Sequence, residues 1–261
     1  MLYGGTFNYN ISDIIFVMIQ LNIPCSEVKR FTTGSSHDAQ AFSRFLKEIF
    51  GEEKMNETVP IPKVCVVSAA VDPYPPEPYL FRNYELSPLV KPHAEMMGTS
   101  SCKMADAVQA TTCAPTYYTP AVIGGQKFVD GAIVANNPAA IALAEAALIW
   151  PDRHLDCLVS MGTGTQTPRT NNINSVMAWV RTVVELGMSS HITHKIASTV
   201  LGSKYYRFDA EGLGDVDLTE YREDVLNSMI EKGKKYIDRE KDRFDELSRL
   251  LNTISIDETD I

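Results

Sequence analysis

Hydrophobic and polar positions follow one another along this chain in blocks that match alternating strands and helices. Residues 63–70 form a continuous apolar run of strand length, which is typical of a strand buried on both faces. Residues 38–50 place their apolar side chains on one face at helical spacing. The same criteria predict strands at 79–84, 127–130, 155–161 and 205–208, and helices from 12 to Pro24 and at 103–113, 138–149, 173–189 and 220–251.

This alternation predicts an α/β fold with a largely parallel sheet and helices on both of its faces. Ser35 or Ser36 is the expected N-cap of the helix at 38–50, and Ser100 and Ser101 are expected to cap the helix at 103–113. The last helix combines an apolar stripe with interleaved charges, which is typical of a helix with one solvated face. Its predicted stripe consists of Val225, Met229, Ile237, Phe244, Leu247 and Leu251.

Composition narrows the class of protein. With 33 acidic against 24 basic residues, the net charge of −9 argues against a nucleic-acid surface. Five cysteines without a C-x-x-C pair argue against a disulfide framework or a zinc site. The most apolar run, residues 14–19, is too short to span a bilayer and lacks the basic flank of a signal peptide. We expect an intracellular protein, cytoplasmic or peripherally associated with internal membranes, in which residues 14–21 pack in the core or contact lipid.

One carboxylate occupies a position suited to chemistry. Asp130 ends a short β-prone run, Gly131 follows at once, and Asn137 and Pro138 then open an alanine-rich helical pattern. Strand ends in open α/β sheets are where ligand crevices form. Asp-Gly is also among the commonest turn dipeptides, so a plain turn is the alternative interpretation of this segment alone.

Several linked segments, taken together, resemble the patatin-like phospholipases. The gamma type of calcium-independent phospholipase, which joins a patatin domain to a helical tail, is the most similar. The order and spacing of the segments match from about residue 63 to residue 250. The matching segments are FRNY at 81–84, KMA at 103–105 leading to APTYY at 114–118, DGA at 130–132 followed by NNP at 136–138, and SMGTG at 160–164.

The resemblance implies a three-layer α/β/α sandwich over residues 1–210 and an amphipathic helical tail over residues 211–261. It also implies hydrolysis of a phospholipid or another acyl-ester lipid by a Ser–Asp dyad, without a metal or other cofactor. Asp130 would be the proton acceptor, in a D-G-A motif with Gly131 and Ala132. The other residues that would shape the site are Asn136, Asn137, Pro138, Gly162 and Gly164.

Two motifs of the family occur nowhere in the sequence: the nucleophile elbow G-x-S-x-G and the oxyanion loop D-G-G-G-x-R-G. The candidate nucleophile, Ser12, has Asn10 and Ile14 where the elbow has glycines, and a structural N-cap is its alternative role. Residues 1–210 are therefore expected to lack the first strand and the elbow of the patatin domain. Two hypotheses follow: a lipid acyl hydrolase, or a catalytically inactive, truncated relative that associates with lipid or binds a partner.

Three further features have alternative interpretations. The glycine-rich segment 162–165 is either a strand-end loop near the site or a phosphate cradle. His191 and His194 have the i, i+3 spacing of metal ligands on a helix, but the sequence shows no third ligand. Cys113 is either a buried thiol or a nucleophile, and the sequence shows no base for the second role.

Overall fold

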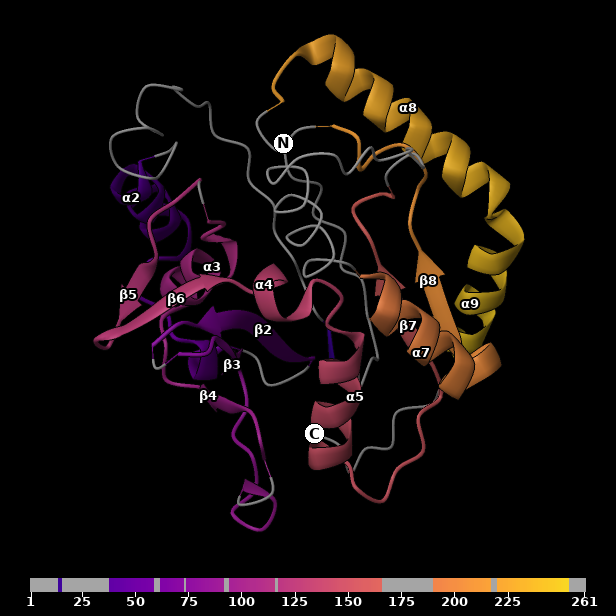
Figure 1. Ribbon diagram of the computed structural model, residues 1–261. Coiled ribbons are helices and arrows are strands. Elements are labelled where there is room, and N and C mark those ends of the chain that lie inside the picture. Colours follow the sequence, from indigo (N-terminus) through magenta and orange to yellow (C-terminus); the bar gives the residue numbers. More distant parts are fainter. Residues whose placement is uncertain are drawn as a thin grey trace, which may run out of the picture.

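Figure 1 shows the computed structural model of the chain. The structure describes residues 14–15, 38–58, 62–72, 74–91, 94–115, 117–165, 190–216 and 220–253. Ser12, the predicted caps Ser35 and Ser36, and the predicted helix at 173–189 lie outside these residues. The roles predicted for Ser12 and for residues 173–189 stay predictions, whereas the cap predicted at Ser35 or Ser36 is replaced by a described residue, Asp38.

Six strands form the main sheet. Five of them lie in the order β4, β3, β2, β6, β5, and β1 pairs with the first residues of β2. The predicted strand at 63–70 is confirmed as β2, with six consecutive buried residues at its end. The bounds of the six strands are β1 (Ile14–Ile15), β2 (Lys63–Ala70), β3 (Glu77–Arg82), β4 (Met97–Thr99), β5 (Ala121–Ile123) and β6 (Gln126–Asp130).

The strand directions differ from the largely parallel sheet that the alternation predicts. β2 runs antiparallel to both β3 and β6, and β5 runs antiparallel to β6, whereas β1 and β4 are parallel to their partners. Connection length explains the difference, because only residues 71–76 join β2 to β3 and a parallel crossover needs a dozen residues or more. Gly124 and Gly125, with φ of 58° and 84°, join β5 to β6 in a two-residue turn that requires positive φ.

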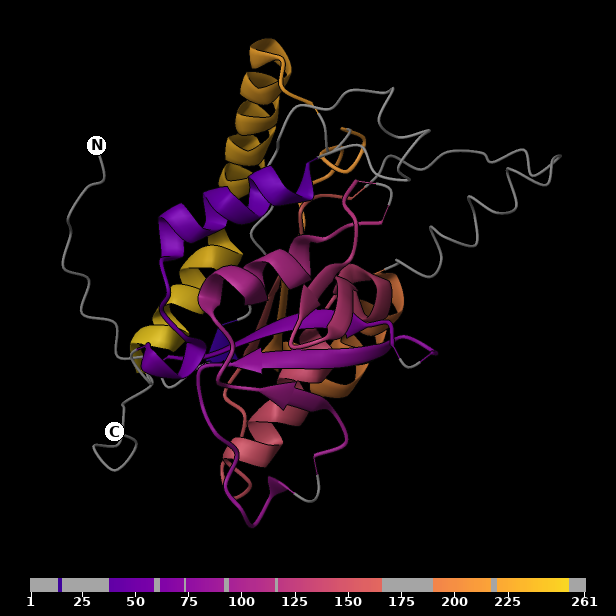
Figure 2. The same cartoon turned by 90° about the vertical axis from the view of Figure 1, so that its left-hand side faces the viewer.

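Helices α2 (Ala39–Phe50) and α3 (Met104–Thr112) cover one face of this sheet (Figure 2). Phe42 of α2 stacks on Tyr118 at 5.0 Å between ring centroids and packs in the largest buried cluster with Phe128 of β6. The N-cap of α2 is Asp38, whose Oδ1 accepts hydrogen bonds from the amides of Gln40 and Ala41, and not Ser35 or Ser36. Likewise the N-cap of α3 is Lys103, which makes no side-chain cap bond, and not Ser100 or Ser101.

The opposite face is covered by α4 (Ala132–Ala135) and α5 (Ala139–Ile149). Ile141 of α5 packs on Cys65 and Val67 of β2 and on Leu80 of β3, side chains that point away from α2 and α3 because side chains alternate along a strand. Helices on both faces of the sheet confirm the predicted α/β sandwich.

A buried ion pair joins α5 to β3. Glu145 is fully buried, and its carboxylate accepts hydrogen bonds from Arg82 Nε at 2.6 Å and Arg82 Nη2 at 2.8 Å. The Tyr84 hydroxyl donates a third hydrogen bond to Glu145 at 2.7 Å. Buried charges are stable only when they are paired and hydrogen-bonded, so this group fixes α5 along the sheet.

A second sheet contains two parallel strands, β7 (Leu158–Met161) and β8 (Tyr205–Phe208). Helix α7 (His191–Leu201) packs on it through Ala197, which lies against Tyr205 and against Ala139 of α5. The sequence pattern predicts both strands but not α7, whose threonine, serine and histidine residues have modest helix propensity.

The predicted single helix at 220–251 is two helices, α8 (Glu223–Arg239) and α9 (Lys241–Thr253), which run along the outside of β8 in Figure 1. The break at Glu240 allows Phe244 of α9 to stack on Phe208 at 4.1 Å between ring centroids. Ile237, predicted to lie in the apolar stripe, is instead 53% exposed. The domain boundary between residues 210 and 211 falls between β8 and α8, and it stays a prediction.

The predicted helix from residue 12 to Pro24 is wrong at Ile14 and Ile15, which form strand β1 and pair in parallel with Lys63 and Val64. A short apolar run has the same composition in a buried strand as in a buried helix, and periodicity cannot separate the two. Within the described residues, no helix is both long and apolar enough to cross a membrane.

Candidate active site around Asp130

Asp130 is the last residue of β6, opposite Ser68 of the central strand β2. Its backbone amide donates a hydrogen bond to the carbonyl of Cys113 at 3.0 Å. Its carboxylate Oδ1 accepts a hydrogen bond from the amide of Ala132 at 2.8 Å. Two backbone contacts therefore hold this side chain at the strand end where the sequence places it.

Gly131 is required by the close approach of two backbone segments. A methyl group at this position would lie 2.2 Å from the carbonyl oxygen of Val67 in β2. The backbone of Gly131 has φ −60° and ψ −20°, a conformation open to any residue, so space alone demands glycine here. The turn after Asp130 is thus pressed against the central strand, which keeps the carboxylate in a fixed place.

Burial raises the pKa of the Asp130 carboxyl above its ordinary value, and the hydrogen bond from Ala132 offsets part of this effect. Within the described residues, no lysine or arginine forms an ion pair with Asp130 that would lower the pKa. A carboxylate whose pKa is raised is a stronger base, which is the property that a proton acceptor needs.

Two potential nucleophiles beside Asp130 are unsuited to that role. Ser68 is fully buried, and its hydroxyl lies 2.7 Å from the carbonyl oxygen of Val129, to which it donates. Cys113 is also fully buried, and burial raises the pKa of its thiol to about 12. At neutral pH this thiol is protonated, so the geometry favours the buried-thiol interpretation of Cys113.

Asn137 links the segment after Asp130 to the second sheet. Its Oδ1 accepts hydrogen bonds from the amide of Ala139 at 3.2 Å and from the hydroxyl of Ser160 at 3.1 Å. Helix α5 begins at Ala139, one residue later than predicted, with Pro138 before its first turn. The N-cap is therefore Pro138, whereas the sequence pattern predicts Asn137 as the N-cap and Pro138 as the first helical residue. The Asn137 side chain still accepts a hydrogen bond from the first residue of α5, and Asn136 is exposed.

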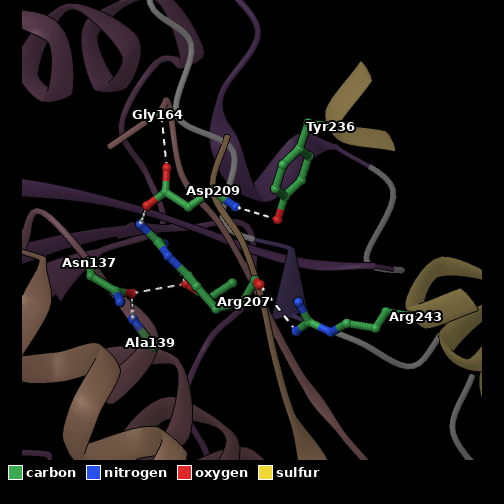
Figure 3. A network of polar contacts seen from close by, with 8 residues as sticks. Asn137, Ala139, Gly164, Arg207, Asp209, Tyr236 and Arg243 are labelled. Atoms are coloured by element: carbon green, nitrogen blue, oxygen red, sulfur yellow. Dashed lines mark hydrogen bonds and ion pairs between the residues drawn. The ribbon is translucent and has the colours of Figure 1, made fainter. Parts of the chain in front are cut away.

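The hydrogen-bond chain continues from Ser160 through β8 (Figure 3). Arg207 Nη1 donates to the Ser160 hydroxyl at 2.8 Å, and Arg207 Nη2 pairs with Asp209 Oδ2 at 2.6 Å. Asp209 Oδ1 then accepts the amide of Gly164 at 2.8 Å. Asn137, Ser160 and the glycine-rich segment, which are distant in sequence, are therefore joined by one network.

The glycine-rich segment surrounds a carboxylate that belongs to the chain itself. A methyl group at Gly162 would lie 2.3 Å from the carboxylate of Asp209, the same group that accepts the Gly164 amide. A bound phosphate would have to displace a group of like charge from this position. The geometry therefore favours the strand-end loop over the phosphate cradle.

Comparison with known proteins identifies the family of this chain. A family model described as patatin-like phospholipase matches residues 10–143, about half of the chain. The chain belongs to the patatin-like phospholipase family. The match contains Asp130, the turn at Gly131 and the Asn137–Pro138 segment, and it ends inside α5.

Curated relatives from this family are similar over most of the chain. Calcium-independent phospholipase A2-gamma of Rattus norvegicus is 30% identical over 239 residues, which are 88% of the chain and 30% of the relative. Phospholipase A I of Arabidopsis thaliana is 34% identical over 168 residues, which are 52% of the chain and 13% of the relative. The 85/88 kDa calcium-independent phospholipase A2 of Mus musculus is 26% identical, over 85% of the chain and 32% of the relative. The chain thus spans about a third or less of the length of these relatives.

Within this patatin-like chain, the structure joins Asn137 to Gly164 through side chains that the sequence does not mark as site residues. Arg207 and Asp209 lie in an ordinary polar strand end, where nothing in the sequence signals their role. A signal does exist for the buried pair behind the site, because Glu145 is the one charged residue in an otherwise apolar helix. Its partner Arg82 lies in the FRNY segment at 81–84, which matches the family in sequence but for which the sequence predicts no role.

The histidines predicted as alternative metal ligands, His191 and His194, lie in the first turn of α7. Among the described residues, no three histidine, cysteine, aspartate or glutamate side chains are grouped as a metal site. The candidate nucleophile Ser12 is not among those residues, so its distance from Asp130 stays open.

Proposed function

We propose that this chain carries the acid half of a lipid acyl hydrolase, in which Asp130 accepts the proton of a serine nucleophile. The substrate is a phospholipid or another acyl-ester lipid. Membership of the patatin-like phospholipase family and the names of the relatives, which are phospholipases, support the substrate class. Ser12 is the candidate nucleophile within the sequence.

The observation that carries the proposal is the Asp130 carboxyl, which is half-buried and raised in pKa, and which accepts a backbone hydrogen bond from Ala132. A group placed in this way is costly to keep charged, and a structural turn does not require it. In the proposed reaction the serine oxygen bonds to the ester carbonyl carbon while its proton passes to Asp130. The tetrahedral intermediate then expels the alcohol, which takes the proton from Asp130, and water releases the acyl group with Asp130 again as base.

The proposal also fixes a pH dependence. Asp130 acts as a base only when it is deprotonated, and burial raises its pKa. Hydrolysis should therefore fall as the pH drops through a value above the ordinary range of an aspartate. The names of the relatives describe calcium-independent enzymes, and we expect hydrolysis by this chain to continue in EDTA.

The test uses the purified chain, a short-chain ester and a fluorophosphonate probe with peptide mapping. We expect one labelled serine, Ser12. Asp130→Asn should lower labelling and hydrolysis by at least about a hundredfold, the usual range for a lost general base. Asp156→Asn, at an exposed position, is the matched control and should retain both activities.

Each other result has a definite meaning. Labelling of Ser12 that Asp130→Asn does not change would refute the dyad. Absence of both labelling and hydrolysis from the folded wild-type chain would refute the hydrolase and leave the lipid-associating or partner-binding hypothesis.

A further inference from the structure

Helix α7 exposes an apolar stripe that does not pack in the core clusters of the described residues. Ile192, Ile196 and Val200 follow one another at four-residue spacing and are 66%, 59% and 73% exposed. The buried side of the helix is a different one, where Ala197 packs on Tyr205. Figure 1 shows α7 in front of β7 and β8, on the outside of the molecule. Three large aliphatic side chains in a row on a surface helix indicate a surface that contacts something else.

The charge around this stripe is basic in a protein that is acidic as a whole. From residue 190 to residue 206 the chain contains Lys195 and Lys204 and no aspartate or glutamate, although the net charge of the chain is −9. Arg207, the next basic residue, is largely buried and paired with Asp209, so it adds no net charge to this surface. Lys195 lies one helical turn from Ile192 and is exposed. Lys204 follows the end of the helix, where its Nζ donates to the carbonyl of Leu155. An anionic surface is therefore the partner that matches α7.

A second exposed apolar pair, on α8, differs from the α7 stripe in the charge that surrounds it. Ile230 and Ile237 on α8 are 55% and 53% exposed and lie two helical turns apart. Acidic and basic residues alternate around them, and Glu231 pairs with Lys234 at 2.8 Å. The apolar area of α8 thus comes without net positive charge, whereas α7 combines apolar area with positive charge alone.

We propose that α7 is the surface through which this chain lies on a membrane that contains anionic lipid. The helix would lie in the plane of the interface, with Ile192, Ile196 and Val200 among the acyl chains and Lys195 at the phosphate level. This inference goes beyond the proposed hydrolysis, because docking needs neither Asp130 nor a nucleophile. Hydrolysis and docking can therefore be tested separately.

The experiment measures flotation of the full chain with vesicles of ether-linked lipids, which contain no acyl ester to hydrolyse. One set is pure phosphatidylcholine and the other contains about a third phosphatidylserine, each at low and high salt. Wild type should bind the anionic vesicles more tightly, and high salt should weaken this binding. Ile192→Ser/Ile196→Ser should lower the partition coefficient at least about tenfold. Lys195→Glu should remove most of the preference for anionic lipid.

The matched control is Ile230→Ser/Ile237→Ser, which removes two isoleucines of similar exposure from α8 and should bind within about twofold of wild type. Circular dichroism of each variant confirms that the fold is retained. Failure of wild type to float, or equal losses from the α7 and α8 variants, would overturn the proposal. So would concentration-dependent dimerisation that Ile192→Ser/Ile196→Ser abolishes, because a second copy of the chain would then be the occupant of the stripe.

Discussion

Removing the Glu145 carboxylate should destabilise the chain more than most single substitutions do. Glu145 is fully buried and accepts three hydrogen bonds, two from Arg82 and one from Tyr84. Glu145→Leu fills similar volume but leaves the Arg82 guanidinium, only 5% exposed, without a counter-charge. Breaking a buried pair in this way costs roughly 3–5 kcal/mol of the free energy of unfolding. Glu145→Gln, which keeps the shape and one acceptor, should cost less.

A variant that replaces the whole buried pair tests this explanation more sharply than a single substitution, because it should be more stable than Glu145→Leu. Arg82→Met/Tyr84→Phe/Glu145→Leu removes all three polar side chains together, so no buried charge is left without its partner, and apolar side chains of similar volume occupy the space. Replacement of a whole buried pair is often neutral or stabilising, so this triple variant should be more stable than Glu145→Leu by about 2 kcal/mol or more. If the cost came only from altered packing, three substitutions would be worse than one.

Urea unfolding followed by circular dichroism gives the free energy of unfolding and its denaturant dependence for each variant. The matched control is Asp245→Ala, which breaks the exposed i, i+4 pair with Lys241. This change should cost no more than about 0.5 kcal/mol. A Glu145→Leu loss as small as that of the control, or a triple variant no more stable than Glu145→Leu, would refute the account of the buried pair.

Three further substitutions or treatments have defined outcomes. Asp130→Asn should remove hydrolysis and raise the free energy of unfolding at pH 7, because burial raises the pKa of Asp130 in the folded chain and so penalises its charged form. In urea titrations below the pKa of the unfolded chain this gain in stability should vanish. A loss of stability at pH 7 would contradict the prediction. Gly131→Ala should lower the free energy of unfolding by about 1–3 kcal/mol in the same assay, because the added methyl group would meet the Val67 carbonyl. The control Gly233→Ala, in open space within α8, should raise it by about 0.5–1 kcal/mol, and equal effects of the two changes would exclude the steric explanation. Iodoacetamide at pH 8 should modify half-buried Cys157 well before fully buried Cys113, whose pKa is about 12, and mass mapping that finds the reverse order would show that Cys113 is accessible.

Local pattern predicted the elements whose signal lies within one segment. Residues 63–70 are apolar without interruption because β2 is covered on both faces, and residues 205–208 carry the β-prone side chains of β8. Strand direction depends on connections, and the short link at 71–76 was a usable signal for antiparallel pairing. The same holds for Gly124–Gly125, a two-residue glycine turn that indicates the β5–β6 hairpin.

The candidate site divides in the same way. Asp130 and Gly131 could be placed at a strand end because the dipeptide and its flanks are contiguous. The reason for the glycine could not be found from sequence, since the obstructing carbonyl belongs to Val67, in another strand. Arg207 and Asp209 were missed because their partners, Ser160 and Gly164, lie more than 40 positions away in the chain.

The loop after β7 has a consequence for recognition by sequence motif. Its glycines do leave room for an anion, but that anion is the side chain of Asp209. A tethered group competes at an effective concentration set by its tether, and even a short flexible tether reaches roughly millimolar. The Asp209 carboxylate is positioned by β8 and by Arg207, so a free phosphate would have to compete with a group that is already in place. A glycine-rich segment can therefore have the open space of a ligand loop while the group in that space is part of the same polypeptide.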